Sequence, residues 1–250
     1  MIFLQGGDGF LGSYIYKLLK KNKFKVKKID KNEFKYKNCE IFINCSTNSR
    51  KYLSKTKDFY EFNNSIKNIK KTIVKFNFKK YILISTCEVY SDKKNSSEKS
   101  NINFNNLSNY GFYKYLCELL IIKETQKWLI LRCNGIIGEN MKKGPIYDII
   151  NKKEVWANPN SKYQLIHAED VAKIIIKLIK KNVYNKIYNI CSNNNTKIKN
   201  ISDIIGFKSK YKKKLPVINY KFNNNKIKKI LNIKSTEFYL QKFIKKNLFN

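Results

Sequence analysis

The sequence predicts an α/β fold built on an open, doubly wound parallel sheet. Three observations predict it. Short apolar runs alternate with stretches of helical spacing, the run at 81–84 is apolar throughout, and a cluster of glycines separates the first apolar run from the first helical stretch. Such alternation indicates βαβ units, and a continuously apolar strand is typical of a parallel sheet that is covered on both faces.

The individual elements follow from the same patterns. Apolar runs predict strands at 1–5, 24–30, 40–45, 81–85, 128–133 and 186–191. Apolar residues at helical spacing predict helices at 10–21, 58–76, 109–124 and 170–180. The Asn-, Ser- and Lys-rich stretch at 92–108 is expected to be loop, and 192–226 is rich in Lys and Asn without the character of a long disordered tail.

The length of 250 residues suits one large domain or a main domain with a small appendage. We expect residues 1–138 to form the main domain, with 168–191 returning to it, and 139–250 to form a smaller region. The sequence has no run of eighteen apolar residues, and its apolar start leads straight into glycines. We therefore expect a cytoplasmic protein without a membrane span or a signal peptide.

The formal net charge of +34 would ordinarily indicate a nucleic-acid or membrane partner. Arg50 and Arg132 are the only arginines, however, and the lysines are spread along the whole chain. Direct base recognition favours the bidentate guanidinium of arginine, so we expect no specific nucleic-acid partner. A single histidine and six scattered cysteines without a C-x-x-C pair make a metal site improbable, and we expect none.

The first chemical motif is the glycine cluster between the first strand and the first helix, Gly6-Gly7-Asp8-Gly9-Phe10-Leu11-Gly12. Glycines let a backbone turn tightly and approach a pyrophosphate at a helix N-terminus, so we assign cofactor contacts to Gly6, Gly9, Phe10, Leu11 and Gly12. Asp30 closes the next strand, eighteen residues past Gly12, where it would bind the adenosine ribose. This acid favours NAD, while the neighbouring Lys28 and Lys31 leave NADP open.

The second motif places Tyr110 four residues before Lys114 on a predicted helix. An ammonium on the same helix face can lower the pKa of a phenol, which would make Tyr110 a candidate acid/base. Thr86 ends a buried strand at the sheet edge where ligands bind in such folds, so it is a candidate partner for a substrate hydroxyl. The neighbouring Ser85 is expected to bind backbone locally.

Taken together, the motifs resemble the extended short-chain dehydrogenase/reductase family, of the NAD-dependent nucleotide-sugar epimerase/dehydratase type. Besides the glycine cluster, the segments that carry the resemblance are Asn44-Cys45-Ser46-Thr47, Tyr60-Glu-Phe-Asn63, Ser85-Thr86-Cys-Glu88-Val-Tyr90, Tyr110-Gly-x-x-Lys114-x-x-x-Glu118, Leu131-Arg132-x-Asn134-x-x-x-Gly138, Ile166-His167-x-x-Asp170 and Tyr188-Asn189-Ile. They occur in the family's order over nearly the whole chain.

The resemblance implies a Rossmann-type domain, a small C-terminal substrate-binding region and a catalytic set of Thr86, Tyr110 and Lys114. Tyr110 would be the acid/base, and Lys114 would bind the nicotinamide ribose and lower the pKa of Tyr110. Ser46 would lie near the cofactor. The resemblance further implies a nucleotide-sugar substrate, a homodimer formed through helix 109–124, and a role in polysaccharide biosynthesis. Residues assigned to substrate binding are Glu88, Asn134 and Arg132.

Several residues depart from the family pattern. Gln5, Ser91, Tyr113 and Cys133 replace a Thr, a Gly, a Ser and a Pro, respectively. Cys87 stands where dehydratases often carry an acid, which favours an epimerase or a 4-keto-sugar reductase over a dehydratase.

Some alternatives stay open. Arg132 could bind a nucleotide phosphate, although pairing with an acid such as Glu118 is favoured, and His167 is expected to be structural. A non-catalytic dinucleotide-binding protein of the same fold, and an RNA-associated protein, are the competing functional hypotheses.

Overall fold

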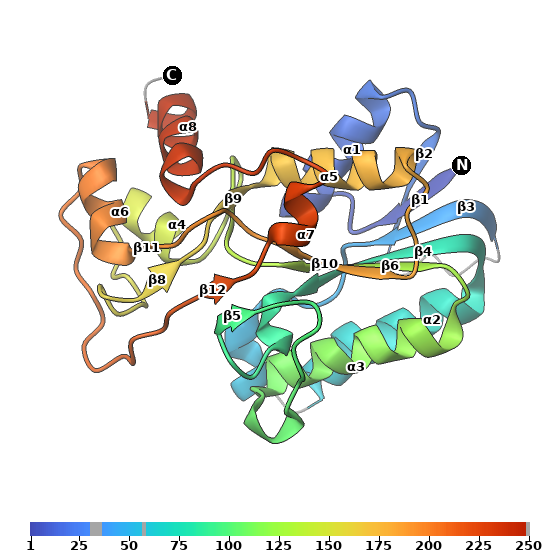
Figure 1. Ribbon diagram of the computed structural model, residues 1–250, viewed down its shortest axis with the longest axis horizontal. Coiled ribbons are helices and arrows are strands. Elements are labelled where there is room, and N and C mark those ends of the chain that lie inside the picture. Colours follow the sequence, from blue (N-terminus) through green and yellow to red (C-terminus); the bar gives the residue numbers. More distant parts are fainter. Residues whose placement is uncertain (31–36, 57–58, 249–250) are drawn as a thin grey trace. The chain divides into compact units, whose positions relative to one another are not determined.

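The computed structural model describes residues 1–30, 37–56 and 59–248 (Figure 1). They form two compact units. The first comprises Met1–Ser91, Ser100–Cys133 and Ala172–Tyr188, and the second comprises Asp92–Lys99, Asn134–Val171 and Asn189–Asn250. The predicted division into 1–138 with 168–191, and 139–250, thus differs at its edges, because 92–99 and 134–138 join the second unit and the returning segment is 172–188.

The first unit is built on a six-stranded sheet in the order β10-β6-β4-β3-β1-β2 (Figure 1). The strands are β1 (Ile2–Gln5), β2 (Val26–Ile29), β3 (Lys37–Asn44), β4 (Phe76–Thr86), β6 (Trp128–Cys133) and β10 (Lys186–Ile190). The pairings β1–β2, β1–β3, β3–β4 and β4–β6 are all parallel. Since the chain proceeds from β1 to β2 on one side and to β3 on the other, the strand order reverses at β1, which confirms the predicted doubly wound fold.

Helices cover both faces of this sheet. Helices α1 (Phe10–Lys21) and α5 (Ala168–Lys180) lie on one face, and α2 (Lys67–Lys75) and α3 (Asn109–Glu124) lie on the other (Figure 1). Short helical turns connect these elements. The turn η1 (Lys51–Lys55) follows β3, and η2 (Phe62–Ile66) leads into α2. The turn η3 (Cys87–Val89) follows β4, and η4 (Phe104–Asn106) precedes α3.

Two predicted bounds were wrong: the end of the helix at 58–76 and the start of the strand at 81–85. The helix ends at Lys75, and β4 begins at Phe76, five residues earlier than predicted. Phe76 is buried and packs against Phe42 of β3, with ring centroids 5.0 Å apart. Pairing with β3 and aromatic packing therefore extend the strand back through Phe76-Asn-Phe-Lys-Lys80, which precedes the continuously apolar run.

The core under α2 and α3 is aromatic. Phe42 stacks on Tyr81 with a centroid separation of 5.3 Å, and Phe3 meets Phe76 edge-on at 5.9 Å. The buried Tyr81 hydroxyl accepts a hydrogen bond from Asn44 Nδ2 at 2.8 Å, so the polar end of this ring is satisfied. This aromatic packing joins β1, β3 and the amino-terminal half of β4.

The second unit contains short elements. They are β5 (Lys94–Ser96), β7 (Ile136–Ile137), α4 (Pro145–Ile150), β8 (Lys162–Tyr163), β9 (Ile166–His167), β11 (Thr196–Lys197), α6 (Ile198–Ile205), β12 (Lys221–Phe222), α7 (Asn225–Lys228) and α8 (Thr236–Leu248). The stretch expected to be loop, 92–108, therefore carries β5 and η4, and the Lys- and Asn-rich stretch 192–226 also carries secondary structure. It forms through long-range pairs such as β5 with β12 and β8 with β11, which local pattern does not reveal.

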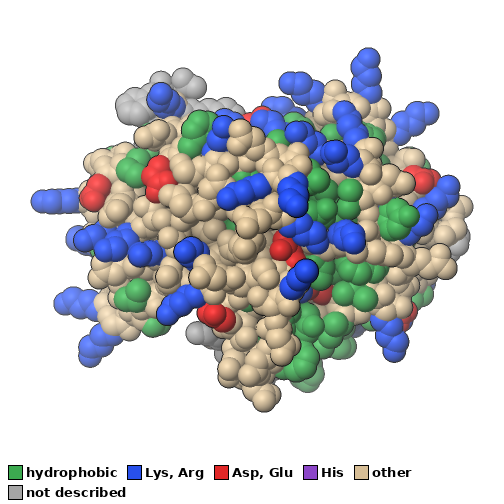
Figure 2. All heavy atoms as spheres, viewed as in Figure 1, with side chains coloured by type: hydrophobic (Ala, Val, Ile, Leu, Met, Phe, Trp, Pro, Cys, Tyr) green, Lys and Arg blue, Asp and Glu red, His purple; other side chains and the backbone are tan. Residues whose placement is uncertain are grey.

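Two surface properties complete the description. No helix among the described residues combines the length and apolar character needed to cross a membrane. On the face of the molecule in Figure 2, the Lys and Arg side chains are dispersed between apolar and uncharged surface rather than gathered in one cluster.

Candidate active site

The glycine cluster forms a closed turn between β1 and α1. Gly6 has a φ of +81°, and the Gly9 amide donates to the Gly6 carbonyl at 3.0 Å. A Cβ atom on Gly12 would lie 1.9 Å from the Gly6 oxygen, so only glycine allows this approach. Helix α1 begins at Phe10 with neither a side-chain cap nor an acid in its first turn. Its N-terminal amides and positive dipole end therefore suit an anion.

A buried donor next to the turn also fits a dinucleotide. Gln5 is fully buried, and its Nε2 has no hydrogen-bond partner. Its Oε1 lies 2.7 Å from Ser46 Oγ, which fixes the orientation of the amide. Because an unpaired buried amide is costly, an acceptor oxygen from a bound ligand would stabilise this arrangement. The turn, the helix terminus and Gln5 together fit a dinucleotide.

The predicted ribose acid, Asp30, is exposed directly after β2. Lys28, which precedes it, pairs with Asp8 at 2.5 Å, and its stem packs beside Gly7. Lys28 is thus engaged within the turn, while Lys31, the other residue that leaves NADP open, lies outside the described residues.

Thr86 and Tyr110 meet at the carboxyl end of β4. The Thr86 side chain hydrogen bonds to the Tyr110 phenol and also accepts from the Glu88 amide at 3.2 Å. Tyr110 occupies the first turn of α3, where Ser108 caps the helix by accepting from the Gly111 amide at 3.2 Å. Two residues that the sequence separates by 24 positions are therefore brought into contact by the β4–α3 packing.

The pKa of Tyr110 is raised above its ordinary value of ~10. Burial is the main cause, and the carboxylates of Glu88 and Glu61 raise it further, while the Thr86 hydrogen bond lowers it. The Lys114 ammonium lies over the Tyr110 ring, 5.5 Å from its centroid, and donates to Thr47 Oγ1. The expectation that Lys114 lowers the pKa of Tyr110 below its ordinary value is therefore wrong, because desolvation and two carboxylates raise it.

Contacts connect Tyr110 to the glycine turn. A Cβ atom on Gly6 would lie 2.9 Å from the Cys45 carbonyl carbon, so the turn packs directly on the segment that follows β3. Ser46 and Thr47 continue this segment, and Thr47 accepts from Lys114. Contacts therefore link the glycine turn, the segment after β3 and Lys114 within the first unit.

Arg132 is placed differently. It is 2% exposed, and its Nη2 donates to Glu118 Oε2 at 2.6 Å, while the Glu118 carboxylate also accepts from Ser85 Oγ. The expected pairing of Arg132 with Glu118 is confirmed. The substrate-phosphate role is unsupported because the guanidinium is buried against Glu118, and Ser85 binds that carboxylate rather than backbone.

The model of the NAD-dependent epimerase/dehydratase family matches residues 33–191, which is more than half of the chain. The chain belongs to this family. The predictions that the chain is an enzyme of the epimerase/dehydratase family and that it depends on NAD are therefore confirmed. The match starts after the glycine turn, so the role of the turn rests on its own geometry.

Solved structures of this family share the fold. A UDP-galactose 4-epimerase is 16% identical with a TM-score of 0.81, and the alignment covers 97% of each chain. A UDP-glucuronic acid 4-epimerase from Bacillus cereus is 17% identical (TM-score 0.77), covering 98% of this chain and 99% of that one. A dTDP-4-dehydrorhamnose reductase from Clostridium acetobutylicum is 18% identical (TM-score 0.77), covering 97% and 98%. A comparison with curated proteins gives no match.

Sequence reasoning missed two residues beside the candidate site. Glu61 is 3% exposed, accepts from Asn48 and from Ser65 Oγ at 3.2 Å, and acts on the pKa of Tyr110. Thr47 holds Lys114. Both lie in segments that carried the resemblance, but the contact of Thr47 with Lys114 and the effect of Glu61 on Tyr110 arise only in the folded chain.

Glu88 and two residues of the second unit complete the predicted set. Glu88 is largely buried and forms an ion pair with Lys51 at 2.8 Å. In the second unit, Asn134 Nδ2 donates to the Gln164 carbonyl at 3.4 Å. His167 is fully buried, its Nδ1 accepts from the Glu169 amide at 3.2 Å, and burial lowers its pKa, which agrees with a structural, neutral imidazole.

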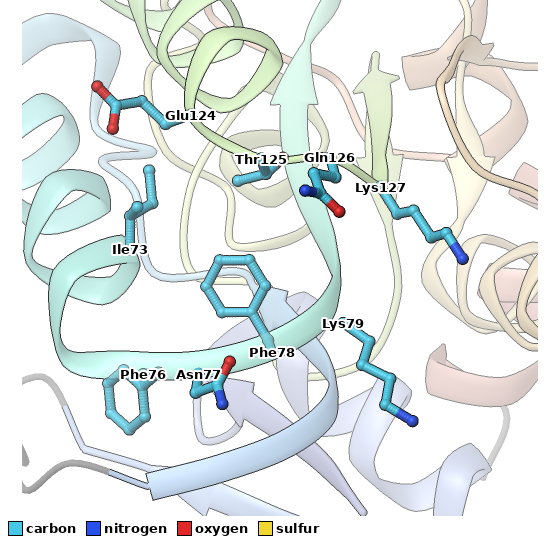
Figure 3. Close-up of a pocket in the computed structure, with 9 residues that line it drawn as sticks. All are labelled: Ile73, Phe76, Asn77, Phe78, Lys79, Glu124, Thr125, Gln126 and Lys127. Carbon is cyan, nitrogen blue, oxygen red and sulfur yellow. The ribbon is translucent and has the colours of Figure 1, made fainter.

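A separate cavity of about 440 Å³ opens at the amino end of β4 (Figure 3). Two of its three charged lining residues form surface ion pairs: Lys79 pairs with Glu40 at 3.2 Å, and Glu124 pairs with Lys70 at 3.0 Å. Because Thr86 lies at the opposite end of β4, this cavity is not part of the candidate active site. No group of three His, Cys, Asp or Glu residues within the described part of the chain could hold a metal ion.

The close approach of η3 to α3 gives a first prediction. A Cβ atom on Gly111 would lie 2.3 Å from the Glu88 carbonyl oxygen. We expect Gly111→Ala to lower the free energy of unfolding by about 1–3 kcal/mol and to displace Tyr110 from Thr86, with loss of turnover. Urea titration and an activity assay measure both.

Gly206→Ala is the control for this prediction, because its φ of +80° strains an alanine although nothing lies within 4 Å of the added carbon. This variant should lose stability and keep its activity. Full activity of Gly111→Ala would contradict the prediction.

Proposed function

We propose that the chain epimerises or reduces a nucleotide-activated sugar with NAD(P), and that Tyr110 is the acid/base. The contact of Thr86 with Tyr110, next to a Lys114 that is linked through Thr47 to the glycine turn, is the observation that carries the proposal. The neighbours support the substrate class, since the Bacillus cereus epimerase structure contains UDP-glucuronic acid and NAD.

The residues divide the work as follows. The glycine turn and the N-terminus of α1 would hold the pyrophosphate, Asp30 the adenosine ribose, and Lys114 the nicotinamide ribose. When bound, NAD supplies a hydride acceptor and NADH a hydride donor. Tyr110 exchanges a proton with the reacting sugar oxygen, and Thr86 hydrogen bonds to the same oxygen and orients it.

The protonation state of Tyr110 favours the reductive direction, in which a keto oxygen receives a proton. Its raised pKa keeps the phenol protonated at neutral pH, and a protonated phenol is the form that gives its proton to a keto oxygen.

Elimination of water would need a further acid next to Thr86, where the chain has Cys87, a buried thiol within 3.1 Å of the Arg132 carbonyl. We therefore favour epimerisation or keto-sugar reduction over dehydration.

The wider setting is part of the proposal. We place the enzyme in the cytoplasm, where it would supply sugars for surface polysaccharide synthesis. We also propose a homodimer formed through α3, whose Leu119 and Ile122 are 39% and 37% exposed. Light scattering of the purified protein tests the dimer, and a monomeric mass would contradict it.

The activity is tested with a panel of UDP- and dTDP-linked hexoses and 4-keto-hexoses, incubated with NAD, NADH or NADPH. Chromatography and NMR of the products would show a 4-epimer or a reduced sugar. A protein that binds the dinucleotide and converts none of the sugars would instead be the non-catalytic binding protein of the same fold.

The carboxylate of Glu88 gives a pH prediction. It raises the pKa of Tyr110, because a nearby negative charge disfavours the phenolate. Glu88→Gln removes this charge, so the pKa should fall and the rate of the step that needs the phenolate should rise at lower pH than in the wild type. The pH profile of kcat/KM for sugar oxidation measures the shift. An unchanged profile, or a shift to higher pH, would contradict the assignment.

A further inference from the structure

The Lys114 ammonium is buried and held by a hydroxyl from a different element. Lys114 is 4% exposed, and its Nζ donates to Oγ1 of Thr47, which lies past the end of β3 and is 8% exposed. A buried ammonium needs acceptors because desolvation of an unpaired charge is costly, and hydrogen bonds with one ionised partner are stronger than neutral ones. The Thr47 hydroxyl is therefore an important contact of Lys114.

Thr47 follows Ser46, which forms hydrogen bonds with residues of three elements, β1, β3 and α2. The Ser46 amide donates to Asn44 Oδ1 of β3 at 2.9 Å, and Ser46 Oγ lies 2.7 Å from Gln5 Oε1 of β1. Asn68 Nδ2 of α2 donates to Ser46 Oγ at 2.7 Å. These buried hydrogen bonds hold Ser46, the residue before Thr47, and so restrict the position from which the Thr47 hydroxyl reaches Lys114.

We propose that Thr47 is a positioning residue, whose hydroxyl holds the Lys114 ammonium over Tyr110 in the orientation that binds the dinucleotide. The inference rests on the proposed function. A lysine side chain loses much conformational freedom when it is ordered, and ordering before the ligand arrives removes that loss from the binding step. Without the hydroxyl, Lys114 keeps its charge but loses the hydrogen bond to Thr47 that helps to order its side chain, so the affinity for the dinucleotide falls.

The test is the dissociation constant for NAD, measured by titration calorimetry on the full chain. Thr47→Val replaces the hydroxyl with a methyl group of similar shape, and we expect NAD to bind about tenfold more weakly. Thr47→Ser restores the hydroxyl and should bind within about twofold of the wild type. Thr47→Ala removes the hydroxyl without adding a methyl group, and should repeat the loss if Thr47→Val does not fold.

Thr72→Val is the matched control. Thr72 is fully buried in the same unit, and its Oγ1 donates to the Ile69 carbonyl at 2.7 Å. It should lose stability comparably to Thr47→Val and keep the wild-type affinity for NAD. Folded Thr47→Val and Thr47→Ala proteins that bind NAD as tightly as the wild type would overturn the inference. A wild-type chain that binds no dinucleotide would instead overturn the proposed function.

Discussion

Tyr110→Phe is expected to lower turnover by about 10²- to 10⁴-fold while leaving the fold and the NAD affinity intact. The variant removes the one proton-transferring group that contacts Thr86 at the end of β4. The ring stays in place, because its packing in the first turn of α3 does not depend on the hydroxyl. Initial rates on the best sugar of the panel, together with NAD titration, measure the two effects separately.

Tyr113→Phe is the control for this prediction. Tyr113 lies on the same helix and packs edge-on against Phe112, with centroids 5.7 Å apart. Its hydroxyl has no role in the proposed chemistry, so the variant should turn over like the wild type. A Tyr110→Phe protein that keeps more than about a tenth of the wild-type rate would show that another group carries the proton.

Of the proposed variants, Arg132→Met should show the largest decrease in the free energy of unfolding. The variant leaves the Glu118 carboxylate, which is 0% exposed, without its bidentate partner. Breaking a buried pair in this way costs about 3–5 kcal/mol, which for a chain of this length is a fall in Tm of roughly 6–20 °C. Urea and thermal unfolding followed by circular dichroism measure the loss.

Two further variants make this prediction specific. Replacing both partners, in Arg132→Met with Glu118→Leu, should recover much of the stability, since no uncompensated charge remains. Lys79→Met removes one partner of an exposed ion pair with Glu40 and should cost less than about 1 kcal/mol. An Arg132→Met protein as stable as Lys79→Met would show that the buried pair is not needed for folding.

Elements with strong local signals could be predicted to the residue. Helix 10–21 and helix 109–124 were predicted with the bounds of α1 and α3, because apolar spacing and the flanking glycine and serine define both helices locally. The start of β4 could not be predicted, because Phe76 becomes a strand residue only by pairing with β3. The short strands of the second unit were missed for the same reason.

The candidate site residues divide in the same way, into those that local motifs indicate and those whose interactions form only in the folded chain. Thr86, Tyr110 and Lys114 could be chosen as candidates because each stands in a motif with a chemical reason for its spacing. Thr47 and Glu61 could not, since the hydrogen bond of Thr47 with Lys114 and the electrostatic effect of Glu61 on Tyr110 exist only in the folded chain. The direction of the Tyr110 pKa shift was missed because spacing reveals the ammonium, whereas burial and the two carboxylates appear only in three dimensions.

The most direct test of the account is the dinucleotide content of the protein. The purified, desalted chain is denatured, the released nucleotide is identified by mass spectrometry, and a chain without nucleotide is then titrated with NAD and NADP. We predict one dinucleotide per chain: NAD released on denaturation would indicate a cofactor recycled in place, as in an epimerase, and binding only on titration would indicate a reductase. A folded chain that neither releases nor binds a dinucleotide would contradict the account.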